Sequence, residues 1–143
     1  MPSSSPVLHS APVPVASHEL LAIARHGLAT AATAGSAAER YAASHLAALR
    51  AAAAVLAARA RPGSPRRGPR SVWVVLPQVA PEFSEWAAFF AAGADKRAFA
   101  EAGVVGVVTA READDLMRDA ESFVALVEGI LGVPHQSAFP LVG

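Results

Sequence analysis

The 143-residue sequence contains no cysteine, which excludes disulfides, thiolate nucleophiles, iron–sulfur clusters and cysteine-ligated zinc. Charged residues (17%) and aromatic residues (6%) are scarce, whereas 53% of the residues are hydrophobic. Alanine supplies much of that hydrophobic fraction, and it is the strongest helix former with little side-chain volume. The composition therefore predicts one all-α domain whose helices pack closely.

The sequence also lacks an uncharged apolar run of the ~20 residues that span a membrane, because Arg40, Arg50 and Arg59 interrupt the longest candidate. Residues 1–16 lack the basic start and apolar core of a secretory signal. The motifs of phosphate-binding loops, zinc proteases and serine hydrolases are absent, and the histidines are dispersed. We therefore expect a cytoplasmic protein with no membrane partner, no metal site and no cofactor.

The net charge is zero, but the two halves of the chain differ in sign. Residues 1–75 carry eight arginines and two glutamates, and residues 76–143 carry four basic and ten acidic residues. Such halves can neutralise each other inside one bundle, attract another subunit, or leave a basic face for a polyanion.

Proline, glycine and serine divide the chain into segments. Residues 1–16 are expected to be a disordered tail, residues 133–143 a loose tail, and residues 61–71 an Arg/Pro/Gly loop within a domain that spans residues 17–132. Four segments, 17–34, 36–61, 84–102 and 109–131, have helical periodicity. They predict an up-and-down bundle of four to five helices.

Helix start signals support these limits. Ser17 is a good N-cap for the first helix, and Ser36 with Glu39 and Thr109 with Glu112 are capping boxes for the second and the last. The apolar stripes predict the following core residues: Leu20, Ile23, Leu28, Tyr41, His45, Leu49, Ala52, Leu56, Trp86, Phe89, Phe90, Phe99, Leu116, Phe123, Leu126, Val127 and Ile130. Arg25 is expected to point away from its stripe.

Two valine-rich segments are ambiguous. Residues 72–76 and 104–108 could be helical turns, loops or short paired strands, and two lone strands of this length are marginal. Pro77 and Pro81 are expected to break the chain after the first of them. Gly93 is expected to kink or break the helix predicted over residues 84–102.

Arg40 and His45 form the spacing with the most chemical content, R-x4-H. An imidazole exchanges protons near neutral pH, and a guanidinium matches phosphate oxygens. On one helix the two side chains lie about 140° apart, so they meet on one phosphate only if a second copy of the helix supplies the complementary group. Alternatively, His45 is a hydrogen-bonded core or interface residue and Arg40 is a salt-bridged surface residue.

Residues 39–54 (ERYAASHLAALRAAAA) resemble an actinobacterial branch of the HEPN superfamily, the higher eukaryote and prokaryote nucleotide-binding domains. Residues 86–91 (WAAFFA) and 110–116 (AREADDL) are similar to the same branch. The resemblance implies an all-α, commonly dimeric bundle. Many members are metal-independent RNases, often toxins of toxin–antitoxin pairs, and others bind RNA or nucleotides or act as scaffolds. It implies His45 as acid–base and Arg40 as phosphate clamp in a catalytic member.

A second candidate site is a group of arginines in or beside the predicted loop: Arg59, Arg61, Arg66, Arg67 and Arg70. They could hold RNA phosphates, or they could belong to a solvated loop. The leading hypothesis is a non-catalytic HEPN-like module that binds RNA, a nucleotide or a protein partner as a homodimer. The alternatives are a metal-independent endoribonuclease with a composite Arg40–His45 site, and a structural dimerisation or adaptor module.

Overall fold

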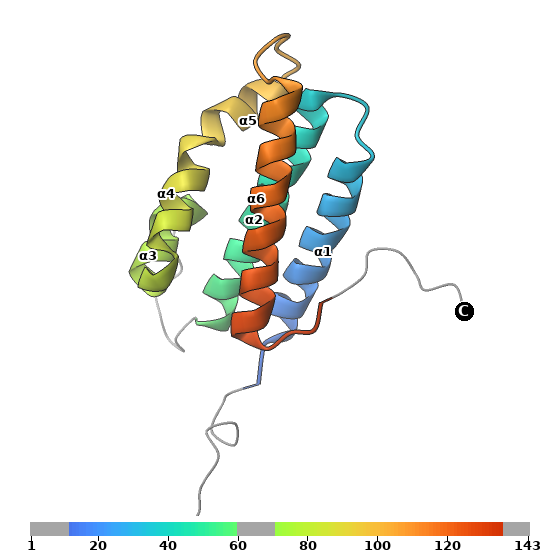
Figure 1. Ribbon diagram of the computed structural model, residues 1–143. Helices are drawn as coiled ribbons and strands as arrows, with labels where there is room; N and C mark the ends of the chain where they lie inside the picture. Colours follow the sequence, from blue (N-terminus) through green and yellow to red (C-terminus); the bar gives the residue numbers. More distant parts are fainter. Residues whose placement is uncertain (1–11, 60–70, 136–143) are drawn as a thin grey trace, which may run out of the picture.

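The computed structural model describes residues 12–59 and 71–135, and this part of the chain is all-α, as the sequence predicts (Figure 1). Its elements in chain order are α1 (Val15–Ala32), α2 (Ala37–Ala58), α3 (Val72–Val79), the short 3-10 helix η2 (Pro81–Phe83), α4 (Ser84–Ala92), α5 (Ala94–Glu101) and α6 (Ala110–Leu131). The three long helices lie alongside one another, and α3, α4 and α5 form a second layer on one side of them.

Helix α2 is the centre of the bundle, because it contacts α1, α3, α5 and α6. It packs most extensively on α1, where alanines from both helices are buried and allow close approach. Built on Gly27 of α1, a Cβ would stand 3.6 Å from the Ala47 Cβ. Ser17 completes this interface: its buried Oγ donates to the Ala54 carbonyl at 2.8 Å. Small residues therefore define the seam between the first two helices.

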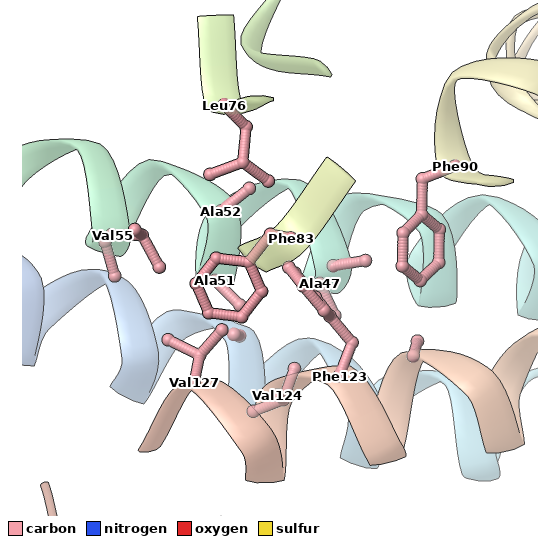
Figure 2. Close-up of a cluster of buried hydrophobic side chains, with 14 of the residues drawn as sticks. Ala47, Ala51, Ala52, Val55, Leu76, Phe83, Phe90, Phe123, Val124 and Val127 are labelled. Atoms are coloured by element: carbon pink, nitrogen blue, oxygen red, sulfur yellow. The ribbon is translucent and has the colours of Figure 1, made fainter. Parts of the chain in front are cut away.

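The opposite side of α2 packs on large side chains. Figure 2 shows Phe83, Phe90 and Phe123 converging with Leu76 on the small residues of α2. These three phenylalanines are fully buried, and Phe123 lies 5.3 Å from Phe90 and 5.8 Å from Phe83 between ring centroids. Aromatic rings in tilted and edge-to-face contact add specific attraction to the burial of their area. This core joins α4 and η2 to α6.

The caps agree with the sequence for α6 and in part for α2. Thr109 Oγ1 accepts from the Glu112 N–H, and the Glu112 carboxylate accepts from the Thr109 N–H, which is a complete capping box. At α2, Ser36 Oγ accepts from the Glu39 N–H, but the Glu39 carboxylate contacts the Ser36 hydroxyl instead of its N–H. Helix α6 ends at Gly132 in the left-handed conformation that favours glycine.

Several predicted limits were wrong. Helix α1 begins at Val15 rather than after Ser17, which is buried instead of capping. Residues 72–79 form helix α3, because burial of Trp73, Val75 and Leu76 outweighs the strand preference of the valines. Residues 104–108 are turns and bends.

The prolines and the glycine of this region also differ in effect. Pro77 lies within α3, and the break comes at Ala80, just before Pro81 starts η2. Gly93 does break the predicted helix, into α4 and α5. A single continuous helix over residues 84–102 is therefore replaced by two short ones.

The predicted core was right for most residues and wrong for a distinct set. Five of the expected core side chains are exposed: Ile23, Phe89, Phe99, Leu126 and Ile130. Arg25, expected outside the core, is buried. Of the rest, Leu20, Leu49, Leu56 and Trp86 are half-buried and pack against the core.

Helix α2 is the one helix in the described ranges that is long and apolar enough to cross a membrane by length and composition. Its position accounts for that composition, because nine of its residues are buried between the surrounding helices. A helix at the centre of a bundle, covered on several sides, has this character.

Candidate functional site

His45 lies at the centre of the bundle with none of its surface exposed. Its Nε2 lies 2.7 Å from the Phe90 carbonyl oxygen, so Nε2 carries the proton and donates it to that carbonyl. The ring stacks on Tyr41 and meets Trp73 and Phe90 edge-on, at centroid distances of 6.5, 6.0 and 5.9 Å. The Nδ1 atom has no hydrogen-bond partner among the described residues. This histidine joins α2 to α4.

Burial lowers the pKa of His45, because the charged imidazolium would lose its hydration. The Phe90 carbonyl and Glu101 oppose this shift only in part. The ring is therefore neutral at neutral pH. Neither a substrate nor water reaches it in this conformation.

Tyr41 lies one turn before His45 and is also buried, which raises the pKa of its hydroxyl. The hydroxyl approaches the chain at Gly93, where an added Cβ would stand only 2.7 Å away. Gly93 therefore has a steric role between α4 and α5: it leaves room for the tyrosine.

Arg40 points away from His45 and contacts two other helices. Its Nε donates to the carbonyl of Ala31 near the end of α1 at 3.0 Å, and its Nη1 lies 2.7 Å from Asp114 Oδ1 on α6. About a quarter of the side chain is exposed. Within one chain, Arg40 and His45 therefore have separate environments, as expected from their separation around the helix.

Among the arginines predicted to bind nucleic acid, only Arg59 falls within the described residues. It is the C-cap of α2, and its Nη2 lies 2.7 Å from Glu82 Oε2 in η2. This hydrogen bond lowers the pKa of Glu82. Arg61, Arg66, Arg67 and Arg70 lie outside the described residues.

A buried ion cluster between α1 and α6 was missed. Arg25 Nε and Nη2 bind the two carboxylate oxygens of buried Glu128 at 3.0 and 2.6 Å, and Nη1 lies 2.5 Å from Glu121 Oε1. These carboxylates raise the pKa of Arg25 against the effect of burial. The signal was available, because Arg25 follows Leu21 and precedes Leu28 at core spacing, which places it on the apolar stripe.

A hollow of about 340 Å³ lies between α4 and α6, lined by Glu85, Trp86, Phe89 and Asp119. Trp86, which lines the hollow, also packs on buried Phe123, at 5.3 Å between ring centroids. The sequence reasoning missed this site because it assigned both Trp86 and Phe89 to the core.

In the described ranges, no group of three or more histidine, aspartate or glutamate side chains could hold a metal ion.

Similarity to a known protein family accounts for this architecture. A family model described as SAV_6107-like HEPN matches residues 31–128, about two thirds of the chain, from the end of α1 to the last turn of α6. No curated protein and no solved structure matches the chain. The matched span contains the R-x4-H spacing of α2 and both capping residues of α6. The chain belongs to the HEPN superfamily.

Proposed function

We propose that this HEPN domain is a non-catalytic binding module. The observation that carries the proposal is the placement of His45, which is fully buried and donates to the Phe90 carbonyl. A general acid–base must come within about 3 Å of the proton that it transfers. Here the surrounding rings of Tyr41, Trp73 and Phe90 occupy the space that a substrate would need.

The environment of Arg40 supports the same conclusion. Its guanidinium already binds the Ala31 carbonyl and the Asp114 carboxylate, and these bonds link α2 to α1 and α6. A phosphate would have to displace Asp114, a partner of the same charge, before it could occupy the same donors. Both residues of the R-x4-H spacing thus have structural partners.

The competing function is a metal-independent endoribonuclease in which two copies combine Arg40 and His45. That reaction requires the aromatic core to open and His45 to reach the surface of a homodimer. Under the proposed function the ligand is instead RNA, a nucleotide or a protein, and the homodimer is one possible form of the module.

The experiment that separates these functions is an RNA-cleavage assay in EDTA, which removes contaminating metal-dependent nucleases. Wild-type protein, His45→Gln and Arg40→Gln are incubated with labelled RNA, and circular dichroism checks that each variant is folded. We expect no cleavage by any of the three. Cleavage by the wild type that folded His45→Gln has lost would overturn the proposal.

A gel-shift assay with the same RNA identifies the ligand class. If RNA binds through the arginine-rich segment, replacing Arg66, Arg67 and Arg70 with glutamate abolishes the shift, and added salt weakens the wild-type complex. The matched control reverses two exposed charges on α6, Arg111→Glu and Arg118→Glu. Equal shifts for all three proteins would place the RNA contact outside the arginine-rich segment, and no shift for any of them at low salt would favour a protein partner.

A further inference from the structure

The hollow between α4 and α6 has an unusual lining for the surface of a small bundle. Two of its residues, Trp86 and Phe89, are aromatic, and the other two, Glu85 and Asp119, are acidic. Neither carboxylate forms an ion pair with any residue that the structure describes. Aromatic rings beside carboxylates attract an organic cation, because the ring faces have a negative electrostatic potential and the carboxylates have a negative charge.

An apolar strip continues from this hollow along α6. Leu126 and Ile130 are 39% and 44% exposed, and they follow Asp119 at seven and eleven residues, which places all three on one face of the helix. Phe89, on α4, is 46% exposed. From Asp119 to Ile130 the strip is about 16 Å long, or three helical turns.

We infer that the hollow lined by Glu85, Trp86, Phe89 and Asp119, with the exposed Leu126 and Ile130 further along the same face of α6, is a groove that binds an arginine-bearing amphipathic segment of a protein partner. The arginine enters the hollow, where its planar guanidinium stacks on Trp86 and Phe89 and pairs with Glu85 and Asp119. Two apolar residues of the same segment then cover Leu126 and Ile130, in the manner of a helix bound in a groove. This inference rests on the proposed binding function and names its partner.

Charge selects this occupant over a nucleic acid. The carboxylates of Glu85 and Asp119, which pair with no residue that the structure describes, repel phosphates, so RNA is disfavoured on this face, whereas a basic segment is attracted. An arginine suits the site better than a lysine, because a guanidinium can stack on a ring and bind a carboxylate in its own plane at the same time.

The test uses a synthetic helical peptide of about 18 residues, mostly alanine, with one arginine and with leucines seven and eleven residues after it. A second peptide has the reversed sequence, because the partner segment can run antiparallel to α6. In a third peptide, citrulline replaces the arginine, which removes the charge and keeps the shape. Binding to the full chain is followed by NMR at the Trp86 indole N–H. We expect one of the two arginine peptides to shift this resonance and the citrulline peptide to bind about tenfold more weakly.

Variants of the protein locate the contact. Glu85→Gln combined with Asp119→Asn should weaken binding of the arginine peptide about tenfold, and Phe89→Ala about threefold. The fold should persist, because Glu85 and Phe89 are exposed and Asp119 is half-buried. The control, Glu19→Gln, makes the same type of change at an exposed position of α1. This variant should bind the arginine peptide as the wild type does.

Two outcomes would overturn the inference. The first is an unshifted Trp86 resonance with both arginine peptides at millimolar concentration. The second is a homodimer that Phe89→Ala dissociates, because the groove would then be covered by a second copy. Both differ from failure of the proposed function, which would appear as RNA cleavage by a protein whose groove variants cleave normally.

Discussion

Removing the Arg25 guanidinium should destabilise the domain more than neutralising its main partner. Arg25 is 6% exposed and binds both oxygens of the buried Glu128 carboxylate. Its third contact, Glu121, is half exposed. Arg25→Met therefore leaves the buried Glu128 carboxylate without its arginine and with the exposed His135, at 3.7 Å, as its nearest described ionisable neighbour. Glu128→Gln leaves Arg25 paired with Glu121.

The size of the effect follows from the two ways in which the isolated carboxylate can respond. Breaking a buried ion pair typically costs about 3–5 kcal/mol. The carboxylate can instead take up a proton. For an ordinary glutamate side chain, protonation costs about 3.7 kcal/mol at pH 7 and about 1 kcal/mol at pH 5. We expect Arg25→Met to lower the free energy of unfolding by about 3–4 kcal/mol at pH 7 and by clearly less at pH 5. The folded variant then holds a proton that its unfolded state releases, so its relative stability falls as the pH rises.

Urea unfolding followed by circular dichroism at pH 5 and pH 7 measures these differences. The set comprises the wild type, Arg25→Met, Glu128→Gln, and Arg25→Met combined with Glu128→Leu. The double variant should recover most of the loss, because an apolar pair requires no desolvation of charge. Equal losses for the two single variants, or a loss for Arg25→Met that does not change with pH, would refute the reasoning.

Further predictions concern the core around His45 and, as a matched control, an open glycine position on α6. Gly93→Ala should lower the free energy of unfolding by about 1–2 kcal/mol, because the new methyl group forces the buried Tyr41 hydroxyl to move. Gly129→Ala has open space for its methyl group in α6 and should raise the free energy of unfolding by up to about 1 kcal/mol. The same urea experiment measures both. Because burial lowers the pKa of His45, the unfolded state takes up a proton first as the pH falls below about 6.5, and wild-type stability should fall with it. His45→Gln should reduce this dependence between pH 7.5 and pH 5, and an unchanged slope would contradict the assignment.

The sequence was sufficient to predict what depends on local chemistry. Thr109 and Glu112 form the expected capping box, and Gly132 ends the last helix as glycine residues commonly do. Tyr41, His45 and Phe123 were correctly placed in the core, because their spacing fixes one face of each helix. The resemblance carried by residues 39–54 led to the right superfamily.

What could not be predicted depends on how far neighbouring helices cover each face. The apolar arc of α6 includes Leu126 and Ile130. The rings of Trp86 and Phe90 on α4 pack against Phe123 of α6, but Leu126 and Ile130 remain exposed. Periodicity along one helix shows which residues share a face, and not which of them another helix will cover. The candidate site in the groove was hidden for this reason.

The burial of the charged Arg25 side chain could not be predicted either. Arg25 was expected to face away because an isolated guanidinium is costly to bury. Its burial became possible only because Glu128 occupies a core position on α6, 103 residues later in the chain. Pairing across such a separation depends on the tertiary arrangement, although a charged residue within each apolar stripe is a signal worth searching for.

The pairing of Arg25 with Glu128 also has a consequence for biosynthesis. Helices α1 and α2 are neighbours in the chain and can form their alanine seam soon after both have left the ribosome. At ordinary rates of translation, however, Glu128 is added about 5 to 20 s after Arg25. During that interval the α1–α2 hairpin holds Arg25 without the Glu128 carboxylate. The side of α2 that later packs on the buried phenylalanines is also still uncovered. We expect the growing chain to complete its fold only once α6 has emerged.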